Sequence, residues 1–160
     1  MTRIGLMGAS SGLLVGPDGS ERLEDGREAL RVWVGAEDGW HDPATQASTR
    51  QRRVGAAPIV ETRIRTATGD VRTDVYGAYM HPDVYMVDVT NDGRVPVVVA
   101  FVTDHLRSVL VGSDAARPDD AASHLLVPRA PRDFVHGADV AAVWQQLTTA
   151  ETRISDEQAL

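Results

Sequence analysis

The residues of this chain that come closest to a catalytic motif are Gly8-Ala9-Ser10-Ser11-Gly12, near the N-terminus. A glycine-rich turn of this kind can hold the pyrophosphate of a dinucleotide where a helix begins directly after it. The same five residues also fit G-x-S-x-G, in which the serine is a nucleophile on a sharp turn between a strand and a helix. Both chemistries therefore need a helix immediately after the glycines.

The sequence that follows the motif argues against both chemistries. Leu13–Val15 predicts a strand, and the Pro-Asp-Gly turn at 17–19 predicts a return strand rather than a helix. The motif resembles the opening of short-chain dehydrogenases, but the tyrosine–lysine pair of that family cannot form, because all 16 basic residues are arginine. Ser10 has only nine residues before it, too few for the strands that precede a hydrolase elbow. We therefore predict an ordinary turn at this position.

The residues that could bind a metal are not spaced so that two of them could bind the same ion. The chain has no cysteine, and its histidines occur in short polar stretches such as Trp40-His41-Asp42, His81-Pro82-Asp83 and Asp104-His105. Neither H-x-H nor H-E-x-x-H is present. We expect these stretches to form turns in which aspartate caps backbone N–H groups, and we predict no metal and no cofactor.

Net charge and the N-terminal sequence argue against two classes of partner, nucleic acids and membranes. A net charge of −7 argues against a nucleic-acid-binding protein, which needs a basic surface for phosphates. The first sixteen residues form neither a signal-peptide core nor a membrane span, so we expect a cytoplasmic protein without a membrane partner. Six arginines between residues 50 and 72 could bind acidic groups, but a solvated strand face is the favoured interpretation.

Alternation of apolar and polar residues predicts a mainly β protein. Val60, Thr62, Ile64 and Thr66 share one face of a strand, and a Gly-containing turn at 67–70 leads into the next strand. The run 95–103 is apolar on both faces, which predicts a central strand. Further strands are predicted at 29–34, 71–79, 84–90, 108–113 and 124–128, and loops at 41–53 and 113–123.

The C-terminal part of the chain changes to a helical period. Val140, Val143, Trp144 and Leu147 recur at i, i+3, i+4 and i+7, which predicts one amphipathic helix over 140–152. The fold class is thus an antiparallel β-sandwich (1–136) with one C-terminal amphipathic helix and tail (137–160). The apolar side of that helix is a candidate surface for docking to a partner or to a second copy of the chain.

Aromatic side chains are the candidates for ligand binding. Trp33, Trp40 and Tyr79 lie in or beside the predicted strands, and flat rings can stack on sugars. Trp33 falls on the face opposite Leu30, Val32 and Val34, so it is either exposed or part of a second core. Aromatic residues of small sandwiches more often belong to a core or an interface, and the sequence leaves both alternatives open.

One long segment resembles a known family. Pro58–Thr62, Gly69–Val71, Val87–Asn91 and Val95–Phe101 match the strand and turn patterns of the N-terminal β-sandwich of actinobacterial glycoside-hydrolase-like proteins. In such proteins the sandwich precedes a helical α/α-barrel and supports it. The resemblance implies an α/α-barrel partner, either downstream or separate. It implies no catalytic residue in this chain, since the catalytic carboxylates belong to the barrel.

These observations predict a non-catalytic accessory domain of a carbohydrate-active protein, which supports a barrel or binds sugar weakly. The alternative is a stand-alone interaction or assembly subunit that uses its C-terminal helix. A small enzyme whose site is assembled from distant residues, such as Ser10 and His41, is the least favoured hypothesis.

Overall fold

The computed structural model describes residues 1–5, 7–24, 26, 29–78, 81, 84–103, 108–111 and 124–127. Every regular element in these residues is a β-strand, which confirms the prediction of a mainly β protein. The chain divides into two compact units, Met1–His105 and Leu106–Leu160. The predicted helix at 140–152, with Val140, Val143, Trp144 and Leu147, and the predicted boundary at 136–137 lie outside the described residues.

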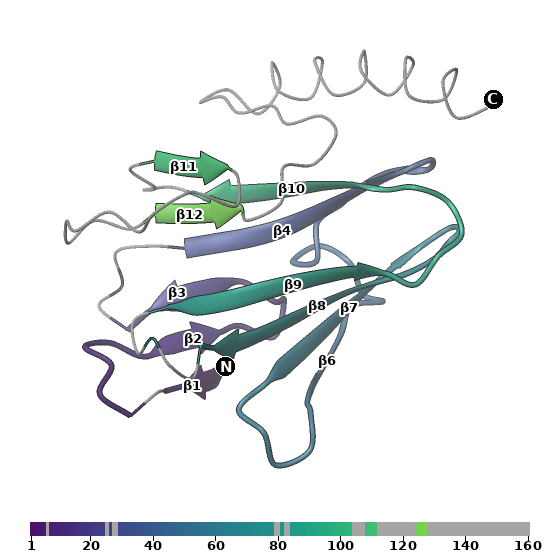
Figure 1. Cartoon of the computed structure of the whole chain (residues 1–160). Coiled ribbons are helices and arrows are strands. Elements are labelled where there is room, and N and C mark those ends of the chain that lie inside the picture. Colours follow the sequence, from purple (N-terminus) through teal and green to yellow (C-terminus); the bar gives the residue numbers. More distant parts are fainter. Residues whose placement is uncertain are drawn as a thin grey trace. The chain divides into compact units, whose positions relative to one another are not determined.

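A six-stranded antiparallel sheet forms one layer of the first unit (Figure 1). Its strands follow the order β1-β2-β3-β4-β10, and β5 pairs with β4 beside this path. The strands are β1 (Thr2–Ile4), β2 (Leu13–Val15), β3 (Glu21–Leu23), β4 (Ala29–Ala36), β5 (Gly39–His41) and β10 (Val98–Thr103). The central strand β4 pairs with β10 along one edge and with both β3 and β5 along the other.

The second sheet has four antiparallel strands in sequence order, β6-β7-β8-β9. They are β6 (Arg50–Arg53), β7 (Val60–Thr66), β8 (Gly69–Gly77) and β9 (Tyr85–Asn91). The turn between β7 and β8 falls at Ala67–Thr68, inside the turn predicted at 67–70. Hairpin connections of this kind fix the register of neighbouring strands.

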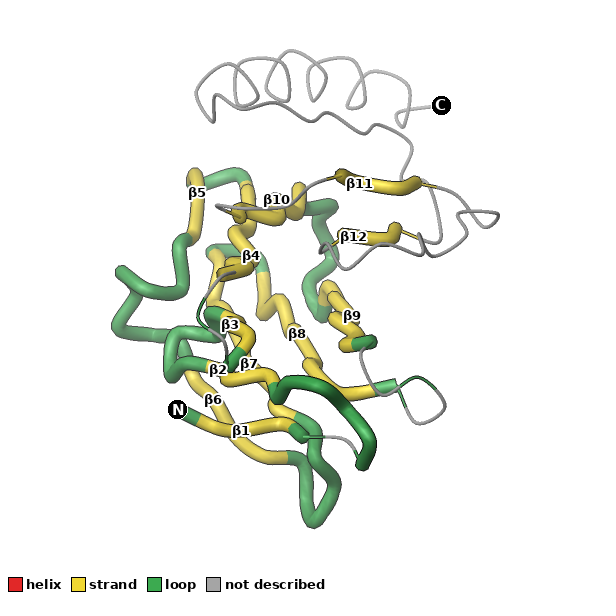
Figure 2. Tube along the Cα trace, turned by 90° about the vertical axis from the view of Figure 1, so that its left-hand side faces the viewer, coloured by secondary structure: helices red, strands yellow, loops and turns green. Residues whose placement is uncertain are grey.

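The two sheets of the first unit pack against each other through two apolar clusters. In one cluster, Leu13 and Val15 of the first sheet contact Val60 and Val75 of the second. In the other, Val34 of β4 packs with Ile64 and Val71 of β7 and β8. Figure 2 shows β2 and β3 beside β7 and β8, which is consistent with a β-sandwich. The predicted inward faces of β7 and β8 are thus confirmed.

Three local predictions differ from the structure. The stretch 41–53, predicted as a loop, contains the strand β6. In the part of the sheet that the structure describes, the strand β10 pairs with β4 alone and lies at the edge, with all six of its residues half-buried, whereas the sequence predicted a central strand. Finally, β11 (Ser108–Val111) and β12 (His124–Val127) of the second unit are strands as predicted, but they pair in parallel.

The described part of the chain includes no helix that is both long and apolar enough to cross a membrane.

Candidate functional site

The N-terminal turn is held by side chains from three other segments of the chain. The backbone N–H of Gly12 donates to Glu24 Oε2 at 2.9 Å, and Arg3 binds the same carboxylate through Nε (2.5 Å) and Nη2 (3.0 Å). The hydroxyl of Tyr85 on β9 donates to the carbonyl of Ser11 at 2.6 Å. A strand, β2, follows the motif directly. The helix that a phosphate loop or a nucleophile elbow requires is therefore replaced by a strand.

His41 has two side-chain partners. It lies at the end of β5 and is 7% exposed; its Nε2 is 2.9 Å from Asp38 Oδ1, and its Nδ1 bonds to the amide of Gln46. The bond from His41 lowers the pKa of Asp38. Asp42 Oδ1 accepts from the backbone N–H of Ala44 at 2.9 Å, which confirms the capping role predicted for it. No set of three potential metal ligands gathers in the described residues.

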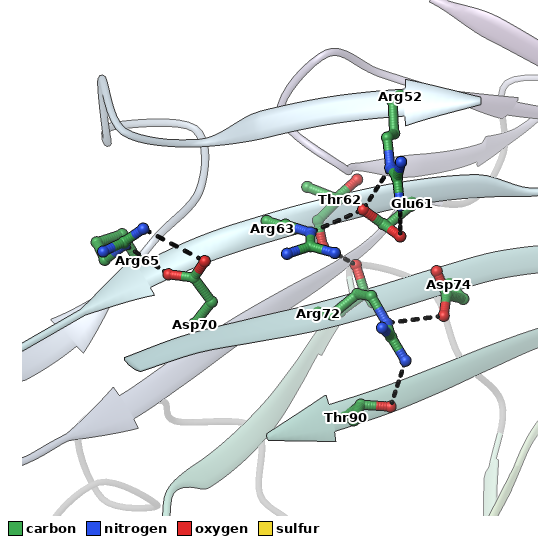
Figure 3. A network of polar contacts seen from close by, with 10 residues as sticks. Arg52, Glu61, Thr62, Arg63, Arg65, Asp70, Arg72, Asp74 and Thr90 are labelled. Carbon is green, nitrogen blue, oxygen red and sulfur yellow. Dashed lines mark hydrogen bonds and ion pairs between the residues drawn. The ribbon is translucent and has the colours of Figure 1, made fainter. Parts of the chain in front are cut away.

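A charged surface covers the outer face of the four-stranded sheet (Figure 3). The register places charges of like sign directly opposite each other: Arg63 faces Arg72, and Glu61 faces Asp74. Ion pairs along each strand offset this repulsion, because Arg63 binds Glu61 at 2.8 Å and Arg72 binds Asp74 at 3.1 Å. The locally basic segment is thus an ion-paired strand face.

Glu61 is the buried centre of this network. Its side chain is 5% exposed and accepts hydrogen bonds from Arg52 Nε (2.7 Å), Arg52 Nη2 (2.8 Å) and Arg63 Nε (2.8 Å). The hydrogen bonds from Arg52 and then from Arg63 outweigh desolvation and lower the pKa of Glu61 to about 2. Two arginines therefore keep the Glu61 carboxylate charged, and it links β6 to β7.

An open pocket of ≈ 420 Å³ lies on the same face. Arg72 pairs with Asp74 in this pocket, and Glu61 is held by Arg52 and Arg63. The lining residues are Val54, Ile59, Glu61, Arg72, Asp74, Tyr76 and Asp88. Tyr76 donates to Asp88 Oδ2 at 2.7 Å, and this bond raises the pKa of Tyr76. A ligand entering this pocket would compete with pairs that are already formed, so the pocket is a poor candidate for recognition.

Two predicted ligand-binding residues meet on the outer face of the six-stranded sheet. Val32 and Val34 point into the core, so Trp33 and Gly35 face outward. The register pairs Gly35 with Trp40, which places Trp40 on the same outward face. The indole of Trp40 lies against Gly35: a Cβ on Gly35 would be 3.1 Å from its Cζ3 atom. Tyr79, the third candidate, lies outside the described residues.

We call this surface the tryptophan face, defined by Trp33, Gly35, Trp40 and the paired residues Val98 and Ala100 of β10. Both tryptophans are half-buried, and Trp33 Nε1 is buried without an acceptor among the described residues. The sequence placed Trp33 on the face opposite Val32 and Val34 but left open whether that face is exposed or belongs to a second core. The position of Trp40 depends on the β4–β5 register, which the sequence did not predict.

The sequence pattern did not point to a further buried carboxyl, that of Glu21. Glu21 on β3 is 4% exposed, and its Oε1 has no partner among the described residues. Burial raises the pKa of Glu21 to about 8. The signal that could have revealed it is alternation, because Glu21 lies two residues before Leu23, which packs against the core.

Comparison with known proteins gives no match for this chain, whether among protein-family models, curated proteins or solved structures.

Proposed function

We propose that this chain is a non-catalytic, carbohydrate-binding accessory domain, and that the tryptophan face is its sugar contact. The observation that carries the proposal is the placement of Trp33 and Trp40 on one outward face, either side of Gly35. Because glycine has no side chain, the ring of Trp40 can lie close to the sheet at this point.

The chemistry of tryptophan suits this role. An indole offers a large, rigid apolar surface at low cost in conformational entropy, and its N–H gives it one polar edge. A pyranose ring likewise has apolar C–H faces and a polar rim. Two indoles on one sheet face therefore form an extended contact for a saccharide chain, while the sheet keeps them in a fixed relative position.

The resemblance of residues 58–101 to the sandwich of glycoside-hydrolase-like proteins supports the same proposal. In that context the domain would assist an α/α-barrel partner, downstream or separate, and the barrel would carry the chemistry. The domain would then hold a polysaccharide near the barrel. With a downstream barrel in the same chain this task needs only modest affinity, because linkage raises the effective concentration.

Binding can be tested by calorimetry of the full chain with soluble polysaccharides and oligosaccharides at millimolar concentration. We expect measurable heat, a change in tryptophan fluorescence, and at least about tenfold weaker binding for Trp40→Ala, since a lost aromatic anchor costs more than about 1.4 kcal/mol. Tyr76→Phe, on the other sheet, is the matched control and should bind normally. Trp40→Phe, which keeps a ring, should retain partial binding. Absence of heat with every glycan would refute the proposal.

A second candidate function, assembly with another copy, is favoured by the strand β10. An apolar strand at a sheet edge offers unpaired backbone groups to another chain, and β10 pairs with β4 alone in the described part. Light scattering of the full chain tests this candidate. A dimer that Val102→Lys converts to monomer would support it, and a monomer at all concentrations would refute it.

A further inference from the structure

Two arginines extend the tryptophan face. The register pairs Arg22 on β3 with Ala29 on β4, and Arg31 follows Ala29 by two residues. Residues two apart on a strand share a face, so Arg31 and Trp33 point to the same side of the sheet. Arg22 is exposed and Arg31 is half-buried. The outward face of β3, β4 and β5 thus presents two guanidinium groups and then two indoles.

These arginines differ from those of the other sheet in their pairing. Arg52, Arg63 and Arg72 each bind a carboxylate of their own sheet. Neither Arg22 nor Arg31, by contrast, forms an ion pair with a carboxylate in the part of the chain that the structure describes. Their charges are therefore available to an anionic ligand.

The charge of Arg31 acts on the carboxylate of Asp18, but that carboxylate already accepts hydrogen bonds from Ser20. Asp18 Oδ1 accepts from the Ser20 backbone N–H (3.2 Å) and hydroxyl (2.7 Å). Burial would raise the pKa of Asp18, but the bonds from Ser20 and, to a smaller degree, the charge of Arg31 lower it. Asp18 thus weakens the field of Arg31 without occupying its donors.

The face also has a direction. Arg31 and Gly35 are four residues apart on one strand, about 13 Å at the usual rise, and Trp40 lies beside Gly35. Beyond Trp40, the β4–β5 turn carries Glu37 and Asp38. An anionic group would therefore be attracted to the arginine end and repelled from the turn.

We propose that the tryptophan face recognises an acidic polysaccharide, one whose sugar rings carry carboxylates. Arg31 and Arg22 bind the carboxylates, since the guanidinium fork matches their geometry, and Trp33 and Trp40 stack on the rings. This inference rests on the proposed function and adds the class of sugar. The net charge of −7 makes general attraction to a polyanion unfavourable, so selectivity must come from this local surface.

The test compares two forms of one polymer, polygalacturonate and its methyl-esterified form, with the full chain. We expect tighter binding to the acidic form, weakened by salt. Arg31→Gln should lower affinity for the acidic form about tenfold and leave the esterified form unaffected. Arg65→Gln, an exposed arginine of the other sheet, is the matched control and should change neither. Trp40→Ala should weaken binding to both forms.

The outcomes separate this inference from the function on which it rests. Equal binding of both forms, lost in Trp40→Ala, would overturn the acidic selectivity and leave the sugar-binding function standing. Binding to neither form, nor to any other glycan, would overturn both. Acidic binding that Trp40→Ala leaves unchanged and salt abolishes would show electrostatic adsorption alone, which also overturns the proposal.

Discussion

Glu21 and Glu61 are equally buried, each 4% exposed, yet the structure places them in opposite electrostatic environments. Glu61 accepts three hydrogen bonds from two arginines, and its pKa falls to about 2. The Oε1 atom of Glu21 has no partner among the described residues, and burial raises the pKa of Glu21 to about 8. One carboxyl is therefore held charged and the other neutral, and the two make the stability of the domain depend on pH in opposite directions on either side of pH 4.5.

Glu21 predicts a loss of stability as the pH rises from 4.5 to 8. Its pKa is raised on folding, so its neutral form favours the folded state fully below pH 4.5, and this advantage is lost as pH rises toward 8. The free energy of unfolding should fall by about 1.4 kcal/mol per pH unit within this window, on the order of 5 kcal/mol in total. Urea unfolding of the full chain between pH 5 and about pH 9 measures this slope.

The control for this prediction is Glu21→Gln, which keeps the size of the side chain and removes the titrating group. The slope between pH 5 and 8 should largely disappear in this variant, and Glu21→Leu should be more stable than the parent at pH 8 because no polar group is left buried. A slope of the same size in Glu21→Gln would show that another group is responsible.

Glu61 predicts the opposite dependence in acid. Its pKa is lowered on folding, so its stabilising effect is present above pH 4.5 and is lost as pH falls toward 2. Arg52→Gln removes the strongest partner of Glu61 and should move the midpoint of acid unfolding to higher pH. Because Arg52 is 63% exposed, the cost at neutral pH should be at most about 1 kcal/mol.

Arg65→Gln is a closely matched control, since Arg65 is 68% exposed and pairs with Asp70 rather than with a buried carboxylate. Its acid midpoint should stay near that of the parent. Equal midpoints for Arg52→Gln and Arg65→Gln would contradict the role given to Arg52.

The sequence predicted the strands that carry apolar side chains at every second residue. Val60 and Ile64 on β7, and Val71 and Val75 on β8, point inward as expected, because burial of one sheet face dictates that pattern. The strand β6 was missed because none of its residues is apolar. Its inward residue Gln51 is instead held by hydrogen bonds to the Gly16 carbonyl (2.5 Å) and to Thr62 Oγ1 (3.3 Å).

The candidate site could be predicted only in part, because the pairing of its strands leaves no apolar pattern in the sequence. Alternation along one strand puts Trp33 on the face opposite Val32 and Val34, but it leaves open whether that face is exposed or belongs to a second core. Whether Trp40 shares that face depends on how β5 pairs with β4, and a short polar turn with exposed residues leaves no apolar signal that fixes this register. Arg22 and Arg31 likewise come together only through the pairing of β3 with β4.

Gly19 and Gly26 allow backbone strain to be separated from steric contact. Their φ angles are +77° and +76°, so alanine is strained at both, by about 1 kcal/mol. A Cβ on Gly26 would meet nothing within 4 Å, whereas one on Gly19 would lie 3.0 Å from Cγ2 of the buried Thr62. Gly19→Ala should therefore be more destabilising than Gly26→Ala by about 1 kcal/mol. Thermal unfolding measures the difference in stability between the two variants. In a double-mutant cycle, adding Thr62→Ser should reduce the cost of Gly19→Ala, because serine lacks the Cγ2 atom.

Gly12, in the N-terminal motif, should not accept alanine without a loss of stability. Gly12 has no positive φ, so its requirement for glycine is steric: a Cβ would lie 2.6 Å from Glu24 Oε2. Gly12→Ala must displace this carboxylate and lose its bond from the Gly12 N–H, at a cost of about 1 kcal/mol. In a Glu24→Ala background, Gly12→Ala should become nearly neutral. An unchanged cost there would show that Gly12 is needed for a reason other than its contact with Glu24.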